Sequence, residues 1–202
     1  MSSPVKRRPT GHHHGDLRNV LLQAALELVT ERGPHGFTLA EASRRAGVSV
    51  AAPYKHFADR ETLLAEIATM GYREQRHRFA AATSGSEDPE EQLASFASAY
   101  VRFAAEEQAL FDVTFNAGLD KSRFDELAKA GDEVTDLLLP IARRLTPDPY
   151  GAFDLLLRVA SAAHGLAVFL RQGLFGAGNS ALVDTEERAA RTARAIVSNR
   201  DV

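Results

Sequence analysis

No cysteine and no tryptophan occur among the 202 residues of this chain. Without cysteine, the sequence excludes disulfide bonds, thiolate metal centres and cysteine nucleophiles. A chain without cysteine also suits a cytosolic bacterial protein. Any metal site or catalytic nucleophile would therefore have to use other residue types.

Signals of β-structure are also missing. Extended runs of valine, isoleucine and threonine do not occur, and neither do the Asn-Gly and Asp-Gly pairs that mark tight hairpins. Alanine and leucine recur throughout, and the hydrophobic fraction of 45% is sufficient for a buried core. These features predict an all-α protein, and its length allows one large domain or two small ones.

Several functional classes lack their sequence signals. The N-terminus has no apolar signal core, and no uninterrupted apolar span is long enough to cross a membrane, so we expect a soluble, cytoplasmic protein. There is no Ser-His-Asp elbow, Gly-rich phosphate loop or His-Glu-x-x-His motif. We therefore expect neither enzyme activity nor a cofactor, and a small α-helical enzyme is the rival interpretation.

Charge is distributed unevenly along the chain. The net charge of −3 does not by itself favour nucleic-acid binding. However, residues 1–80 carry 12 lysines and arginines against 8 acidic residues, whereas the remainder carries 12 against 19. Six of the seven histidines also lie in residues 1–80. This asymmetry indicates a basic N-terminal module on an acidic body.

The first two helices are marked by their ends. Apolar residues recur at helical spacing from Leu17, where Asp16 suits the N-cap and Gly33 ends the helix. Thr38 and Glu41 have the spacing of a capping box, in which each side chain satisfies a free amide at a helix start. They predict a short second helix, because a glycine follows soon after.

The later helices follow from apolar stripes and from breaks between them. Asp59 caps a longer helix that runs to about Ala82, and the polar stretch 83–91 is a linker. Pro140 should kink or interrupt the helix that contains it. Beyond the linker we expect helices at about 89–106, 107–117, 122–145, 150–173 and 184–199.

The string GVSVAAPYKHF at residues 47–57 predicts a helix-turn-helix. Gly47 permits a left-handed turn, and Ser49 can cap a third helix that has Pro53 near its first turn. The third helix then projects from the protein surface and can enter a major groove. Small residues at 50–52 let it approach base edges, and polar side chains at 54–56 suit phosphates. The alternative is an ordinary helical hairpin in an α-bundle.

Residues 17–70 resemble the DNA-binding domain of the TetR family of transcriptional regulators. The resemblance rests on GFTLAEASRRAGVS at 36–49, YKHF at 54–57 and DRETLL at 59–64. It implies a three-helix helix-turn-helix domain at 16–62. A long helix would join this domain to an α-helical domain at 63–202 that binds an effector and forms a dimer.

The resemblance also implies which residues contact DNA. Those that hold phosphates or face bases would be Thr38, Ser49, Tyr54, Lys55, His56 and Arg60, together with Val50, Ala51 and Ala52 at the bases. Arg44 and Arg45 are either backbone contacts or only solvated charge. In a dimer the two recognition helices should lie roughly 34 Å apart, which is one turn of DNA.

Residues 1–15 are expected to form a flexible arm. Its KRR run at 6–8 either reaches the minor groove or phosphates, as basic arms do, or belongs to a disordered tail. The three histidines at 12–14 are adjacent and converge poorly on one ion. We therefore expect no metal site on the arm.

Most of the aromatic residues lie between positions 96 and 175, largely on helical stripes that form a core. Because the TetR resemblance implies a ligand, some should line an apolar pocket with a few polar groups. His164 lies on such a stripe, where it is either a pocket residue or a hydrogen-bonded core histidine. The candidate effector-binding residues are Tyr100, Phe103, Phe111, Phe115, His164 and Val168.

Two further features belong to the C-terminal half. The His164-Gly165 pair resembles that of one TetR subgroup, in which a tryptophan precedes it by a turn; Ala160 stands at that position here. The stretches 153–172 and 184–199 suit a dimer interface built from two helices of each subunit. The alternative is packing within one chain.

These observations predict a one-component transcriptional regulator. We expect a homodimeric repressor that binds palindromic operator DNA and is released by an apolar or amphipathic small molecule. The alternative within the same fold is a regulator controlled by a protein partner.

Overall fold

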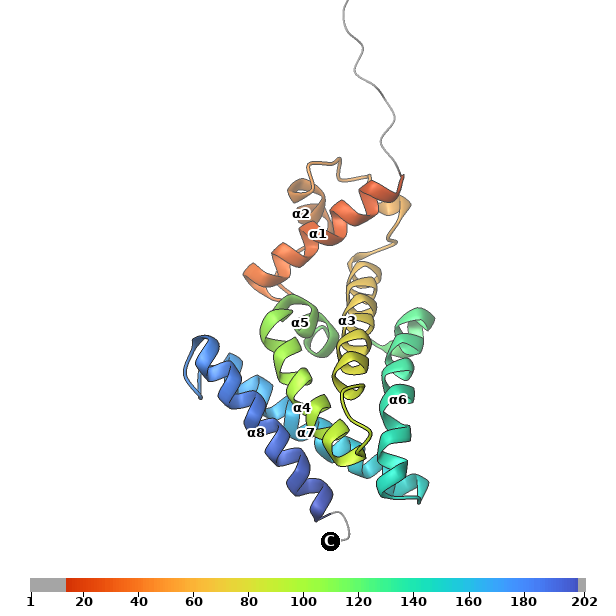
Figure 1. Ribbon diagram of the computed structural model, residues 1–202. Helices are drawn as coiled ribbons and strands as arrows, with labels where there is room; N and C mark the ends of the chain where they lie inside the picture. The colour runs from red at the N-terminus through yellow and green to blue at the C-terminus, as the bar shows by residue number, and fades with distance from the viewer. Residues whose placement is uncertain (1–13, 200–202) are drawn as a thin grey trace, which may run out of the picture.

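The computed structural model of the chain describes residues 14–199 (Figure 1). Over this range it contains eight α-helices, two short 3-10 helices and no strand, which confirms the all-α prediction. Residues 1–13 lie outside the described range, so the expected roles of the arm and of its KRR run stay predictions. The first helix begins at His14 instead of Leu17, so Asp16 lies inside it and the prediction that Asp16 is its N-cap is wrong.

The N-terminal part comprises α1 (His14–Arg32), α2 (Leu39–Arg45), η1 (Pro53–Lys55) and the start of α3 (Arg60–Thr83). The capping box is confirmed: the Glu41 amide donates to Thr38 Oγ1 at 3.2 Å, and the Thr38 amide donates to Glu41 Oε2 at 2.8 Å. Asp59 caps α3 as predicted, accepting a 2.7 Å hydrogen bond from the amide of Thr62. Local signals thus set the helix ends here.

The third helix predicted from Ser49 is wrong as an α-helix. A turn is followed by the short 3-10 helix η1, and no side chain caps it. Pro53 has no N–H to bond the Ser49 carbonyl, which instead accepts from Ala52 at 3.0 Å. The next turn closes in the same i to i−3 pattern, with the His56 amide 2.8 Å from the Pro53 carbonyl.

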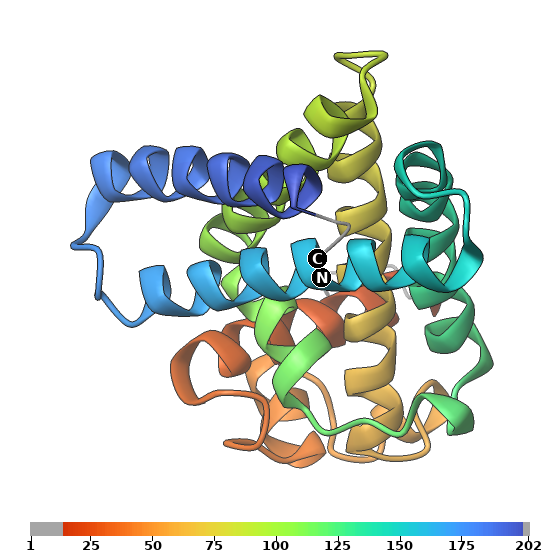
Figure 2. The same cartoon turned by 90° about the horizontal axis from the view of Figure 1, so that it is seen from below.

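The C-terminal part is built from five α-helices and one short turn of 3-10 helix. They are α4 (Pro89–Glu106), α5 (Gln108–Asn116), η2 (Lys121–Arg123), α6 (Asp125–Leu145), α7 (Pro149–Arg171) and α8 (Gly178–Ser198). Seen from below, α7 and α8 lie side by side across the end of the molecule (Figure 2). In Figure 1 this end lies opposite α1 and α2.

One helix start and the effect of one proline differ from the sequence prediction. The last helix begins at Gly178 instead of 184, and Pro140 lies inside α6 without interrupting it. Pro140 and Asp136, the residue whose carbonyl loses its donor, are both exposed. Water can therefore satisfy that carbonyl, which lowers the cost of an internal proline.

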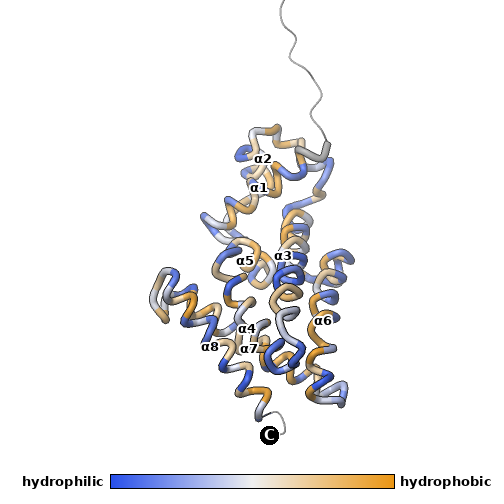
Figure 3. The backbone as a smooth tube through the Cα atoms, in the orientation of Figure 1, coloured by the Kyte–Doolittle hydropathy of each residue, from blue (hydrophilic) through white to orange (hydrophobic). Residues whose placement is uncertain are grey.

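The helices enclose two cores that share α3. One core joins α1, α2, Phe57 and the first half of α3 to parts of α5 and α6, and the other lies among α3 to α8. Leu110 and Val134 pack against both. Hydrophilic and hydrophobic stretches alternate along α1, α3, α6 and α8, as expected for helices with one buried side (Figure 3). The predicted domain boundary at 62/63 falls inside α3 and stays a prediction.

We expect the contact between α3 and α5 to tolerate no added methyl group. A Cβ at Gly71 would overlap Thr114 Oγ1, which itself donates a 2.7 Å hydrogen bond to the Leu110 carbonyl. Gly71→Ala should therefore lower the free energy of unfolding by about 1–3 kcal/mol in urea denaturation. Thr114→Ala in the same chain should restore part of that loss, whereas equal losses with and without it would contradict the contact.

Candidate nucleic-acid interface and effector site

The turn after α2 has the geometry of a helix-turn-helix. Gly47 takes the left-handed conformation predicted for it, with φ of 68°, and the Val48 amide donates a 3.0 Å hydrogen bond to the Ser43 carbonyl. Leu39 and Phe57 are buried in the core beneath the turn, with Val48 packed against them. The backbone at 48–55 is therefore held on a packed base at one end of the molecule (Figure 1).

Side chains on this turn divide into an inner and an outer set. Pro53 is buried, whereas Val50 is 46% and Tyr54 59% exposed, and Ala51 and Lys55 are also exposed. Ser49 is exposed, and Ala52 is partly buried. Small and polar groups thus face solvent, as predicted for a surface that approaches bases and phosphates.

The two adjacent arginines of α2 behave differently. Arg45 donates to both carboxylate oxygens of Glu31, at 2.7 and 2.8 Å, and lies 3.4 Å from Glu27. These hydrogen bonds hold the pKa of Glu31 below its ordinary value. The exposed side chain of Arg44 makes no hydrogen bond or ion pair to any residue in 14–199. Arg45 therefore ties α2 to α1, and Arg44 keeps its charge available.

Three predicted phosphate contacts have partners or burial within the protein. Arg60 donates to the Pro34 carbonyl, and its guanidinium lies 5.3 Å from the Phe37 ring centre. The Thr38 hydroxyl donates to Glu41 Oε2 at 2.9 Å. His56 is partly buried, and its Nε2 has no partner within residues 14–199. Arg60 thus braces the start of α3, whereas Lys55 and Tyr54 remain exposed.

One hydrogen bond connects the helix-turn-helix region directly to α5. His35 Nε2, in the loop after α1, lies 2.9 Å from the backbone carbonyl of Asn116 at the end of α5. Nearby, Arg123 makes two hydrogen bonds, at 2.9 and 2.7 Å, to the carboxylate of Glu61 at the start of α3. Both links join segments more than fifty positions apart, so they couple the two halves of the chain.

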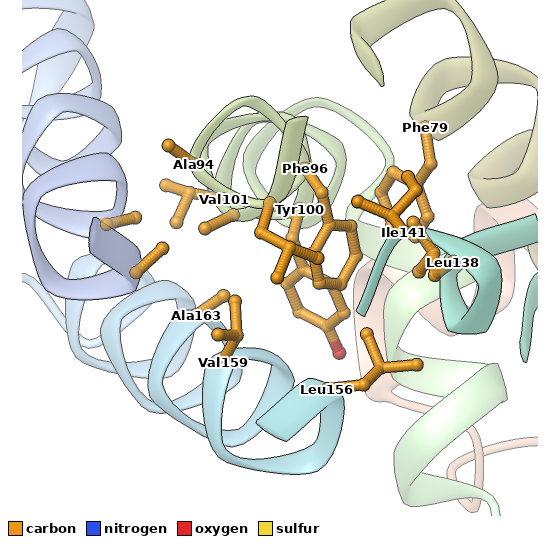
Figure 4. Packing of buried hydrophobic residues seen from close by; sticks show 14 of the residues in the cluster. Phe79, Ala94, Phe96, Tyr100, Val101, Leu138, Ile141, Leu156, Val159 and Ala163 are labelled. Atoms are coloured by element: carbon orange, nitrogen blue, oxygen red, sulfur yellow. The ribbon is translucent and has the colours of Figure 1, made fainter. Parts of the chain in front are cut away.

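Four of the predicted effector residues form one cluster. The Tyr100 hydroxyl lies 2.9 Å from Nδ1 of His164, and the ring centres of Tyr100 and Phe115 lie 6.2 Å apart. The His164 ring stacks on Phe111 at 5.3 Å and meets Phe115 edge-on at 5.1 Å. Figure 4 shows Tyr100 with its hydroxyl oxygen at the margin of the carbon-lined core. We call Tyr100, Phe111, Phe115 and His164 the aromatic cluster.

The other two predicted effector residues lie beside the aromatic cluster. Phe103 is fully buried, with its ring 6.4 Å from that of Phe111. Val168 is partly buried against the C-terminal core. The six predicted residues therefore lie in one region of the structure, although Phe103 is a core residue.

The sequence analysis did not predict the polar residues around the aromatic cluster. Asp112 and Arg171 form a two-fold hydrogen-bonded ion pair at 2.8 and 2.7 Å, and the Arg171 guanidinium lies 4.9 Å from the centre of Phe111. Tyr72 meets Phe115 edge-on at 6.4 Å and accepts a hydrogen bond from Lys121. The apolar stripe of α3 could have indicated Tyr72, but no sequence signal pairs Asp112 with Arg171.

Burial shifts two groups in the cluster toward their neutral forms. Desolvation raises the pKa of Tyr100 far above its ordinary value and lowers the pKa of His164. At pH 7 the tyrosine hydroxyl keeps its proton and the imidazole is uncharged. The cluster therefore presents aromatic faces and neutral hydrogen-bonding groups.

An open groove of about 830 Å³ lies elsewhere, between α3, α4 and α8. Its walls are mainly small residues such as Ala82 and Ser95, and arginines line its rim. Arg102 and Arg194 are paired there with Glu186 and Glu91. Within residues 14–199, no group of three or more metal-ligating side chains occurs.

Comparison with protein families decides the assignment. A family model described as bacterial regulatory proteins, tetR family, matches residues 21–67. A second model, described as the tetracyclin repressor-like C-terminal domain, matches residues 93–196, which is more than half of the chain. The chain belongs to the TetR family. It is therefore a DNA-binding transcriptional regulator in broad class, and the likeness to one His-Gly subgroup stays a prediction.

Solved structures share the TetR fold over nearly the whole chain. A protein of unknown function from Rhodococcus sp. RHA1 is 26% identical, with a TM-score of 0.72 over 91% of this chain and 98% of that one. The TetR-family regulator PfmR from Thermus thermophilus is 22% identical, with a TM-score of 0.65 over 88% and 97%. The fatty acid degradation regulator FadR from Bacillus halodurans is 14% identical, with a TM-score of 0.66 over 91% and 97%. No curated protein matches the chain.

The TetR assignment also bears on α7. This helix is long and apolar enough to cross a membrane by length and composition, contrary to the expectation from uninterrupted apolar runs. Only 28% of its apolar window is buried in the single chain. One such helix is weak evidence for a membrane protein, and TetR-family chains typically form dimers that would cover such a helix.

We expect His164 to make the stability of this TetR-family chain sensitive to acid. Its folded pKa lies below the ordinary value of 6.5, so the unfolded chain takes up the proton first as the pH falls. The free energy of unfolding should decrease below about pH 6.5 and be insensitive to this group above about pH 7.5. Urea denaturation between about pH 5 and 8 measures this, and His164→Gln should flatten the curve. The exposed His77→Gln is the control, and an unchanged curve in His164→Gln would contradict the assignment.

Proposed function

We propose that the protein is a one-component repressor that binds palindromic operator DNA as a homodimer and is released by a small molecule. The observation that carries the DNA side is the exposed turn at 48–55, with small side chains beside free cationic groups. No acidic residue lies within 48–55, so phosphates meet no like charge on the turn itself. Cytoplasmic localisation follows from the binding of genomic DNA by a bacterial type of regulator.

The structure supports a division of the predicted DNA contacts into two groups. Val50, Ala51 and Ala52 would meet base edges, with Ser49 at the start of the turn. Arg44, Tyr54 and Lys55 would hold phosphates because they are exposed and unpaired within the described range. Thr38 and His56 would add to these contacts at the edge of the same surface. Arg45 and Arg60 would act indirectly, by fixing α2 and α3 in place.

Homodimer formation is supported by the uncovered face of α7. Tyr150 is 88% exposed, Phe153 and Leu157 are each 52% exposed, and Phe169 is exposed on the same helix. An added Cβ at Gly165 would meet nothing within 4 Å, so the helix surface there is open to a partner. With α8 alongside, two copies can bury these residues in a four-helix contact.

Effector release is supported by the position of α5. Phe111 and Phe115 contribute its face to the aromatic cluster, and Asn116 at its end holds His35 of the DNA-binding half. A ligand among the aromatic rings would displace α5, and the displacement would reach the loop between α1 and α2. The ligand shifts DNA occupancy only by the difference between its affinities for the two arrangements.

We expect two cations to contribute equally to the salt dependence of DNA binding. Lys55→Ala and Arg44→Ala should each lower the slope of log K against log salt by about 1.8, because each removes one phosphate contact from both subunits of the dimer at about 0.9 per contact. Fluorescence anisotropy with an operator obtained by in vitro selection measures the slope. Lys129→Ala removes the same charge from exposed α6 and should leave the slope unchanged.

Arg45→Ala completes that comparison, because Arg45 lies next to Arg44 but is bound to Glu31. It should leave the salt slope unchanged and lower the stability of the fold. A slope change in Arg45→Ala, or none in Lys55→Ala, would mean that another surface contacts the DNA.

We expect Leu157→Arg to convert the dimer into a folded monomer. The change places a charge in the apolar face of α7, where a partner helix would have to bury it unpaired. Analytical ultracentrifugation measures the mass, and circular dichroism checks that helicity is retained. Val20→Arg, at an exposed apolar position on α1, is the control and should remain dimeric. A dimeric Leu157→Arg would exclude this face as the interface.

A further inference from the structure

Gln75 on α3 is a buried amide without a partner. The residue is 2% exposed, and its Nε2 makes no hydrogen bond to any atom in residues 14–199. Two other buried polar residues of α3 are satisfied: Thr69 donates to the Ala65 carbonyl at 2.8 Å, and Thr83 to the Phe79 carbonyl at 2.8 Å. An unmade hydrogen bond at a buried amide destabilises the fold, so Gln75 needs an explanation.

The helix register directs Gln75 toward the aromatic cluster. Tyr72 and Phe79 lie three positions before it and four after it, on the same buried face of α3. Tyr72 meets Phe115 at 6.4 Å, and Phe79 stacks on Tyr100 at 5.8 Å. The residues on both sides of Gln75 therefore contact two members of the aromatic cluster.

The groups around this position are neutral or already paired. Arg171 is bound to Asp112, and the exposed Lys121 donates to the Tyr72 hydroxyl. The Tyr100 hydroxyl and the His164 imidazole bond each other. Lys121 has no carboxylate partner within residues 14–199, but it is exposed, whereas Gln75 is buried. Burying an ionised ligand group beside Gln75 would remain strongly unfavourable. A carbonyl oxygen has the acceptor that an amide N–H requires and carries no charge.

We propose that Gln75 anchors the effector, and that the effector is an uncharged, mainly aromatic or apolar molecule whose carbonyl oxygen accepts a hydrogen bond from Gln75 Nε2. This inference rests on the proposed effector site and narrows its ligand class. It excludes carboxylic acids and amines, which the broader expectation of an apolar or amphipathic molecule allows. Aromatic faces of Phe111 and Phe115 would hold the body of the ligand.

The neutral naphthyl ketone prodan tests the inference on the full-length dimer, because its emission responds to hydrogen bonding at its carbonyl. The wild type should bind it saturably. Gln75→Leu should weaken the affinity about tenfold, the loss of one hydrogen bond, and shift the emission of the bound dye to shorter wavelength. Thr69→Val, which removes a satisfied hydroxyl from the same helix, should leave dye affinity unchanged. A naphthalene carboxylate of similar size should compete at least about tenfold more weakly than prodan.

Thermal unfolding separates a ligand anchor from a structural residue. Gln75→Leu should unfold at the same or a higher temperature, because it removes an unsatisfied group, whereas Thr69→Val should unfold at a lower one. The inference is overturned if the wild type does not bind prodan saturably, if Gln75→Leu binds it as tightly, or if the carboxylate competes equally. It is also overturned if Gln75→Leu is destabilised like Thr69→Val.

The repressor proposal fails separately. Anisotropy of the ligand-free wild type with selected operator DNA measures that function without the dye. A wild type that binds no selected DNA would overturn the proposed regulator while the prodan results still decide the ligand site.

Discussion

α3 and α5 approach each other so closely at Gly71 that the Thr114 side chain leaves no room for a Cβ there. This contact decides how the rest of the molecule works, because α3 belongs to both cores and α5 touches both proposed functional regions. From α5, Phe111 and Phe115 face His164, and Asn116 holds His35. A shift of α5 therefore cannot be absorbed locally, since close-packed helices have few alternative arrangements.

Arginine pairing separates structural charge from functional charge on the DNA-binding half. Exposed ion pairs contribute little stability individually, yet each one fixes where a guanidinium lies. Arg45 bound to Glu31 sets the position of α2 against α1, and Arg60 against Phe37 fixes the start of α3. Arg44 and Lys55 lack such partners within residues 14–199 and stay free for a polyanion. The paired arginines therefore fix the helices on whose surface the unpaired Arg44 and Lys55 lie.

How much could be predicted from the sequence depended on whether the signal was local. Thr38, Asp59 and Gly47 each mark a helix end through their own backbone amides or φ angle, and their positions were predicted correctly. The third helix was not, because Gly47 and Ser49 indicated the start of an α-helix whereas Pro53 removed an amide that an α-helix needs. Family resemblance supplied the helix-turn-helix where local propensity alone was ambiguous.

The effector region could be predicted only in part, because it depends on contacts between residues far apart in the sequence. Aromatic residues on α4, α5 and α7 were predicted as a group, but their composition alone could not distinguish core from pocket. Tertiary contacts supply the distinction: Phe103 lies wholly inside, whereas His164 and Phe115 retain access to the surface. Asp112 with Arg171, and Gln75 with its missing partner, depend on residues far apart in sequence or on an absence of contact within residues 14–199. Neither kind of information is encoded in spacing along one helix.

The energetic demand on the coupling is modest. Reducing operator affinity about a hundredfold requires that the ligand favour the released arrangement by about 2.7 kcal/mol. One hydrogen bond to an otherwise unsatisfied buried amide, together with the contacts of two aromatic rings, can supply a difference of that size. The condition is that these contacts form in only one arrangement of α5. An unpartnered amide supplies such a contact on the condition that Gln75 Nε2 reaches the ligand in the released arrangement of α5 and not in the DNA-binding one, because a hydrogen bond made equally in both would leave operator affinity unchanged.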